Sequence, residues 1–169
     1  MSRGFVKEDD QEEIPIVPQR AFLPEGVAKF VTPAGMNQLL AEQQMLVSEK
    51  DNLSSTDENE KRIDLNYINA KLHLLDIRIS EAKVVNPNEQ PQNEIRFGAF
   101  VTLKTEGSGT IQTFQIVGVD EADISKGKIS FLSPLARSLI NKKAGDKVII
   151  KQPKKDTIFE IVEIGYREK

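Results

Sequence analysis

Residues 58–85 read ENEKRIDLNYINAKLHLLDIRISEAKVV, and this stretch decides the architecture of the N-terminal half. Its apolar side chains recur every three or four positions, at Leu65, Ile68, Leu72, Leu75, Ile79 and Ala82. This spacing places them along one face of an α-helix and is typical of a coiled-coil seam. The stretch therefore predicts a long helix that packs against a partner helix.

The partner helix is predicted directly upstream. Thr32-Pro33 is a helix start, because Thr is a good N-cap and Pro is tolerated at the first helical position. A weaker seam follows, interrupted by two polar residues; its members are Met36, Leu39, Leu46 and Leu53, and the interruptions are Gln43 and Lys50. The spacing of Ser55 and Glu58 predicts a capping box for the second helix. Because the break between the helices is short, they are expected to run antiparallel.

The C-terminal half changes to the period of β-strands after a linker rich in Pro, Asn and Gln at residues 86–92. Five strands are predicted, at 97–103, 113–119, 128–131, 147–151 and 157–164. A short helix, capped by Ser133 with Pro134 at its first position, separates the third strand from the fourth. The expected class is α+β: an antiparallel helical hairpin followed by an antiparallel sheet with one short helix.

The same patterns predict four regions: an irregular extension at 1–31, the hairpin at 32–85, a linker at 86–94 and a C-terminal domain at 95–169. The extension contains an acidic cluster at 8–13 and several prolines. Two interpretations of it stay open. It either lies loosely on the folded part or docks as an arm through Phe22 and Leu23.

The composition narrows the classes of function. The chain has 169 residues, a net charge of -3 and no Cys, which excludes disulfides, thiolate catalysis and Cys-ligated zinc. The acidic balance gives no electrostatic reason to bind nucleic acid directly. No apolar run is long enough for a signal peptide or a membrane span. We therefore expect a cytoplasmic protein without a membrane partner.

Three segments of the C-terminal half resemble Gre factors, the GreA/GreB family. Residues 129–146 read ISFLSPLARSLINKKAGD, which is similar to the family signature I-S-x-x-S-P-x-A-R-x-L-[IL]-x-K-x-x-G-D. Upstream, FGA at 97–99 and IVGVDEAD at 116–123 resemble the family's F-G-A and I-V-G-x-[DE]-E-A-[DN] segments. The likeness covers roughly residues 32–168 and is dense from 95 onward.

The resemblance implies an FKBP-like C-terminal domain that binds RNA polymerase at its secondary channel, and a hairpin that enters that channel. By this likeness the chain is an accessory factor without an intrinsic cofactor, and any RNA is cut by the polymerase with its own Mg²⁺. Nucleic acid is contacted only indirectly, within the elongation complex, and an intramolecular hairpin predicts a monomer. The candidate polymerase-binding residues are Asp120, Glu121, Leu132, Ser133, Pro134 and Arg137.

The hairpin tip departs from the family pattern. Cleavage-competent factors usually read D-L-S-E-N there, whereas residues 52–55 read NLSS, so both carboxylates are replaced by neutral side chains. Asp57 and Glu58 are the candidate substitutes, as cleavage-assisting and metal-binding acids. Alternatively, they only open the second helix, where negative charge favours the helix dipole. The arms are also shorter than the family layout by about 15 residues in total, which at ~1.5 Å per residue retracts the tip by about 10 Å.

The expected function is therefore that of a Gre-type elongation factor, either a stimulator of cleavage or a non-cleaving regulator or inhibitor. Two other classes are an FKBP-like prolyl isomerase or chaperone and a structural adapter with a dimerising coiled coil. A prolyl isomerase needs an aromatic-lined pocket for the proline ring. The chain has no Trp and 6% aromatic residues, which counts against that class.

Overall fold

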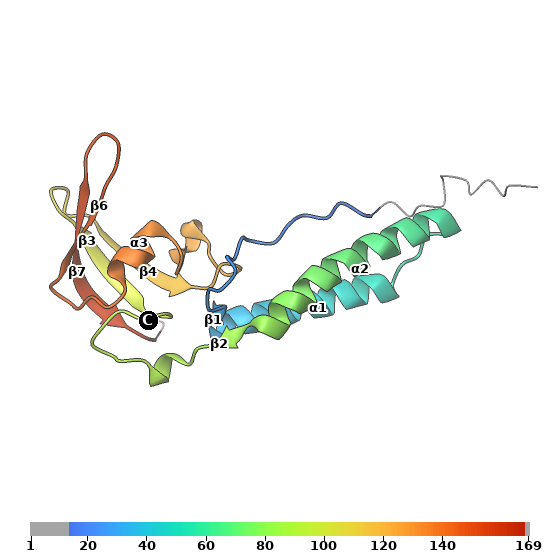
Figure 1. Cartoon of the computed structure of the whole chain (residues 1–169), viewed down its shortest axis with the longest axis horizontal. Coiled ribbons are helices and arrows are strands. Elements are labelled where there is room, and N and C mark those ends of the chain that lie inside the picture. The colour runs from blue at the N-terminus through green and yellow to red at the C-terminus, as the bar shows by residue number, and fades with distance from the viewer. Residues whose placement is uncertain (1–13, 168–169) are drawn as a thin grey trace, which may run out of the picture.

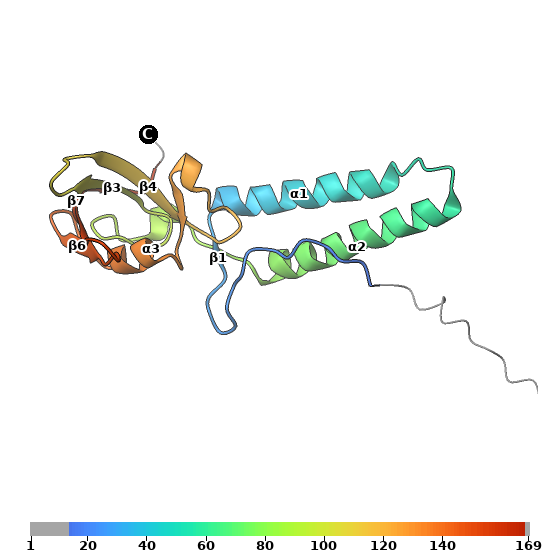
Figure 2. The ribbon, with the colours of Figure 1, turned by 90° about the horizontal axis from the view of Figure 1, so that it is seen from above.

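The structure is a computed structural model that describes residues 14–167, so the acidic cluster at 8–13 lies outside the described residues. A helical hairpin projects from a C-terminal β-sheet (Figure 1). Helix α1 (Pro33–Asp51) and helix α2 (Glu58–Glu81) form the hairpin and run antiparallel (Figure 2). No helix within residues 14–167 is long and apolar enough to cross a membrane.

The core of the hairpin follows the predicted seams. Its buried residues are Val31, Leu39, Leu46, Ile68 and Leu75, and the side chains packed partly against them are Met36, Leu53, Leu72, Ile79 and Ala82. Leu65 is half-buried but lies outside this cluster. At the polar interruption in α1, Gln43 Nε2 donates to Asp76 Oδ1 of α2 at 2.7 Å. The interruption therefore becomes a hydrogen bond between the two helices.

The C-terminal sheet contains five strands in the order β5-β4-β3-β7-β6. The strands are β3 (Phe100–Thr105), β4 (Ile111–Val117), β5 (Lys128–Ser130), β6 (Lys147–Ile150) and β7 (Thr157–Gly165). Helix α3 (Pro134–Leu139) covers one face, with Ala136 and Leu139 fully buried. The α+β class, the five strands and the short helix are confirmed.

Two details of the predicted sheet are wrong. The sheet is mixed rather than antiparallel, because β5 pairs with β4 in parallel. The chain between them carries a 3-10 turn, η3 (Ile124–Lys126), and returns before β5 begins, so the two strands run the same way. The first strand also starts at Phe100 and not at Phe97, since Gly98 adopts a left-handed φ of 88° that extended chain does not tolerate.

The base of the hairpin has a small sheet that sequence patterns did not predict. Strands β1 (Phe30–Val31) and β2 (Lys83–Val84) pair in parallel where the chain enters and leaves the hairpin. A further 3-10 turn, η2 (Pro87–Glu89), lies in the linker to the sheet. Upstream of β1, residues 14–29 have no regular structure and run from the base along α2 (Figures 1 and 2).

Candidate functional site

The tip of the hairpin is the first candidate site, and the start of α2 sets its geometry. Asp57 is the N-cap of α2: its Oδ1 accepts from the backbone N–H groups of Asn59 at 2.8 Å and Glu60 at 3.4 Å. A carboxylate in this position satisfies backbone donors that have no helical partner and favours the helix dipole. Asp57 therefore already has a structural task.

The predicted capping box is wrong, because Asp57, directly before the first helical residue, takes the cap that Ser55 was expected to provide. Ser55 Oγ instead donates to Glu60 Oε2 at 3.1 Å and accepts from the backbone N–H of Asp57 at 3.3 Å. The neutral Asn52 occupies the C-cap of α1. Of the acids near the tip, Asp57 is thus fixed as a helix cap and Glu60 accepts a hydrogen bond from Ser55.

By itself the tip offers few ligands to a divalent metal ion. Of the two candidate ligands, Asp57 is held in the cap and Glu58 is exposed in the first turn of α2. Mg²⁺ takes several hard oxygen ligands in near-octahedral geometry. Across residues 14–167, no group of three or more His, Cys, Asp or Glu side chains is arranged to hold a metal.

The second candidate site is the contact between the hairpin base and the loop after β4, which we call the joint. Asp120 Oδ1 accepts from Arg20 Nη2 at 3.0 Å, and Asp120 Oδ2 lies 3.3 Å from Arg78 Nε. Arg20 also makes a bidentate pair with Glu42, at 2.8 and 3.1 Å. The hydrogen bond to Glu42 and the nearby carboxylate of Asp120 raise the pKa of Arg20 above its ordinary value. This network joins the N-terminal segment, both helices and the sheet.

Glu121 forms the buried part of the joint. Only 6% of the residue is exposed. Its Oε2 accepts from Thr32 Oγ1 at 2.5 Å, and its Oε1 lies 3.3 Å from Lys128 Nζ. The same Thr32 hydroxyl caps α1 by accepting from the backbone N–H of Gly35 at 2.9 Å. Asp120 and Glu121, two candidate polymerase-binding acids, therefore have their partners inside the chain.

Close approach at the joint depends on two glycines. A Cβ at Gly118 would lie 2.6 Å from the carbonyl oxygen of Phe30, and one at Gly35 would lie 2.7 Å from Glu121 Oε2. Three rings pack around the contact with centroids 5.5 to 5.9 Å apart: Phe30, Phe97 and Phe131. Such separations are typical of tilted and edge-to-face aromatic pairs. The segments FGA and IVGVDEAD thus supply Phe97, Gly118, Asp120 and Glu121 to the contact with the hairpin.

The remaining candidate polymerase-binding residues lie together at the start of α3. Ser133 Oγ caps this helix by accepting from the backbone N–H of Ala136 at 3.2 Å. Pro134 and Arg137 are exposed, and Leu132 is half-buried. The inner side of α3 is fixed in the core, so these residues form one ordered surface turn.

Sequence reasoning missed Arg20, Lys128 and the second bond of Thr32 as parts of the joint. The Arg20 and Thr32 contacts connect residues 100 and 89 positions apart, and no local pattern reports pairing at such a separation. One signal was present: Gly35 lies in the first turn of α1. Glycine lowers the stability of a helix, so its presence there indicates that another group packs closely against this position. Of the two residues predicted for a docking arm, Phe22 is 82% exposed and Leu23 is half-buried, and the ionic contacts of this segment are made by Arg20.

Comparison with known proteins identifies the same family as these segments. The family described as "Transcription elongation factor, GreA/GreB, C-term" matches residues 90–166. The transcription elongation factor GreA of Thioalkalivibrio sulfidiphilus is 36% identical over 152 residues, which cover 80% of this chain and 96% of that protein. GreA of Acidiphilium cryptum is 43% identical over 100 residues, covering 59% of this chain and 64% of its own length.

The solved structures that resemble this chain include proteins named as GreA/GreB factors or GreA homologs. The GreA/GreB elongation factor of Nitrosomonas europaea has a TM-score of 0.42 at 21% identity, covering 81% of this chain and 98% of that one. GreA factor homolog 1 of Thermus thermophilus has a TM-score of 0.39 at 22% identity, covering 82% of this chain and 99% of that one. From the extent and identity of the sequence matches, the chain belongs to the GreA/GreB family of transcription elongation factors.

Proposed function

We propose that this chain binds RNA polymerase, places its hairpin in the secondary channel and regulates elongation without stimulating cleavage of back-tracked RNA. Family membership supports the role in elongation. The observation that carries the non-cleaving role is the tip, where Asn52 and Ser55 are neutral and Asp57 caps α2. In this proposal the chain is an accessory factor, and any chemistry on RNA belongs to the polymerase.

The length of the hairpin supports the same proposal. Helix α2 has 24 residues, which at ~1.5 Å per residue is about 36 Å. By the family layout the hairpin lacks about 15 residues in total, or roughly one heptad in each arm. One heptad fewer in each arm ends the tip about 10 Å short. A metal ligand must lie within roughly 2.0–2.6 Å of its ion, so a shortfall of this size would keep a tip carboxylate out of reach and supports the non-cleaving role.

The first test is RNA cleavage in a purified, back-tracked elongation complex. Cleavage should be no faster with this protein than without it. Asn52→Asp with Ser55→Glu should leave cleavage unchanged, because reach as well as charge is missing. The same pair with one heptad inserted into each arm should accelerate cleavage by about 100-fold or more, given that ion positioning contributes several kcal/mol to such reactions. The heptads without the carboxylates are the matched control.

An opposite result would identify Asp57 and Glu58 as working acids. If the unmodified protein stimulates cleavage, Asp57→Asn with Glu58→Gln should be compared with it. This pair removes both charges while Asn keeps the helix cap, so a loss of cleavage could not be blamed on a frayed α2. Stimulation that disappears in this variant would overturn the non-cleaving proposal.

Binding to polymerase is expected to rest on the surface turn at the start of α3. Pro134→Ala combined with Arg137→Ala should reduce co-purification with polymerase about tenfold or more, since exposed Arg residues are often the anchors of interfaces. Ala is well tolerated in a helix, so circular dichroism should be unchanged. Lys151→Ala, in the exposed loop after β6, is the control. Undiminished co-purification of the double variant would remove α3 from the proposal.

A further inference from the structure

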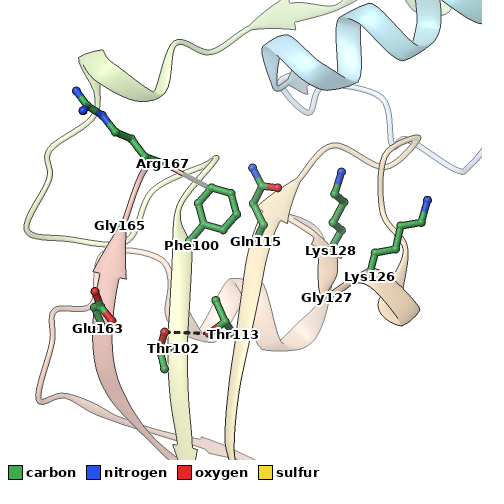
Figure 3. Close-up of a pocket in the computed structure, with 10 residues that line it drawn as sticks. All are labelled: Phe100, Thr102, Thr113, Gln115, Lys126, Gly127, Lys128, Glu163, Gly165 and Arg167. Atoms are coloured by element: carbon green, nitrogen blue, oxygen red, sulfur yellow. Dashed lines mark hydrogen bonds between the residues drawn. The ribbon is translucent and has the colours of Figure 1, made fainter. Parts of the chain in front are cut away.

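The face of the sheet opposite α3 has a cavity of about 310 Å³ that the proposed function does not use. Its position follows from the alternation of side chains along β3. Val101 and Leu103 are buried in the core beneath α3, so Phe100 and Thr102 face the other side. Figure 3 shows these two side chains in the cavity, beside residues of β4, β5 and β7.

Two cross-strand rows form the floor of this cavity. The first row crosses four strands and contains Gly165, Phe100, Gln115 and Lys128. The second row contains Glu163, Thr102 and Thr113, and the two threonine hydroxyls lie 3.0 Å apart. Because neighbouring strands are ~4.8 Å apart, the first row is about 14 Å long. The sheet register therefore fixes an aromatic ring, an amide and a cation in line.

The charge of the lining is positive. Three cations, Lys126, Lys128 and Arg167, stand against one acid, Glu163. Figure 3 shows the two lysines on one side of Phe100 and Arg167 on the other. Lys128 contacts Glu121 of the joint at 3.3 Å. Lys126 is exposed, and after the hydrogen bond from Ser125 its charge contributes to lowering the pKa of Asp123. Since the whole chain carries a net charge of -3, this is a local preference for an anion and not a basic surface.

The ring of Phe100 is accessible because its neighbour in the row is a glycine. A Cβ at Gly165 would meet nothing within 4 Å, so open space lies beside the ring. Aromatic rings flanked by cations bind single nucleotides by stacking on the base and pairing with the phosphate. The amide of Gln115 and the threonine hydroxyls supply donors and acceptors for the polar edge of a base.

We propose that this cavity binds one nucleotide unit, with its base on Phe100 and its phosphate against Lys126 and Lys128. The volume is near the lower end of the roughly 300–1,000 Å³ of small-molecule sites, which limits the ligand to about one unit. The unit comes from either a free nucleotide or a single-stranded RNA. An acidic peptide fits less well, because an uncharged ring and an amide separate the cations.

The test uses the full chain without polymerase. A labelled single-stranded RNA of about eight nucleotides, within the usual site sizes, is titrated at ~50 mM salt and followed by fluorescence anisotropy. Adenosine monophosphate is added as a competitor, and a glutamate-rich peptide of equal charge is titrated separately. RNA should bind and the peptide should not. Competition by the mononucleotide supports a free nucleotide as the source, and RNA binding without competition supports an RNA strand.

Three variants locate the binding in the cavity. Gly165→Ile fills the open space, and Ile is favoured in strands, so the sheet should keep its fold. Phe100→Leu removes the ring but keeps its apolar bulk. Each should weaken RNA binding at least about fivefold. Lys126→Ala should reduce the salt dependence of binding by about one phosphate contact, whereas Lys151→Ala should change nothing.

Several results would overturn this site: binding of neither the RNA nor, in a direct titration, adenosine monophosphate by the unmodified chain; equal binding of the peptide; or unchanged binding in both Gly165→Ile and Phe100→Leu. Thermal unfolding of each variant separates lost binding from lost fold. None of these variants alters the hairpin tip or α3. Failure here would therefore leave the proposal on polymerase binding intact.

Discussion

Glu121→Ala should lower the free energy of unfolding by about 2–3 kcal/mol, because it leaves two buried or half-buried groups without their partner. The Thr32 hydroxyl would lose its acceptor at 2.5 Å, and the Lys128 ammonium would lose a carboxylate at 3.3 Å. The side chain of Glu121 is only 2% exposed, so water cannot readily replace these contacts. Urea denaturation followed by circular dichroism measures the loss.

The same substitution should also separate the unfolding of the hairpin from that of the sheet. The two have distinct hydrophobic cores, and the joint is where they meet. Uncoupled units unfold in two steps rather than one. Glu160→Ala, at an exposed carboxylate on β7, is the control and should have little effect. If Glu121→Ala unfolds in the same single transition at the same urea concentration, Glu121 does not couple the two halves.

Leu75→Ala should destabilise the hairpin by about 2–5 kcal/mol, the usual cost of emptying a large buried position. Leu75 is 0% exposed and lies in the small core between α1 and α2. With only two helices, few neighbours can move into the cavity. Helical circular dichroism during denaturation reports the change. Ile77→Ala, two residues further along the same helix at 43% exposure, should cost far less.

The comparison of these two variants tests the register of the seam and not only its existence. Both replace a large aliphatic side chain by Ala in α2, so helix propensity changes little between them. Equal losses at Leu75 and Ile77 would mean that α2 is rotated relative to the position described here.

Local periodicity was enough to predict most of the fold. The step of three and four residues in α2 and the Thr32-Pro33 start of α1 each depend on neighbours within a few positions. The strand order and the parallel pairing of β4 with β5 cannot be predicted from such neighbours, because they depend on where the chain turns between residues 118 and 127. The left-handed φ of Gly98 likewise prevents the first strand from starting at Phe97. The alternation of apolar residues gives no sign of this backbone conformation.

The candidate sites were less predictable than the elements that carry them. The family segment IVGVDEAD was found in the sequence, but the tasks of its acids were not, because Thr32 and Arg20 are distant in the chain. At the tip, the sequence shows that Asn52 is neutral but not that it ends α1, and the choice of Asp57 over Ser55 as the cap of α2 depended on where the first helical residue falls. Helix boundaries are the least certain part of such predictions.

The long sequence separation between the partners in the joint also sets the order in which their contacts can form during translation. Synthesis runs from the N-terminus, so α1 and α2 can pair by local contacts soon after residue 81 emerges. Glu121 and Asp120 follow about 40 residues later, and contacts that close such long loops form slowly. Until then Thr32 caps α1 alone, and Arg78 has no carboxylate from the sheet. The nascent hairpin therefore forms before its partners exist, and its orientation is set only after the loop that carries Asp120 and Glu121 has been synthesised.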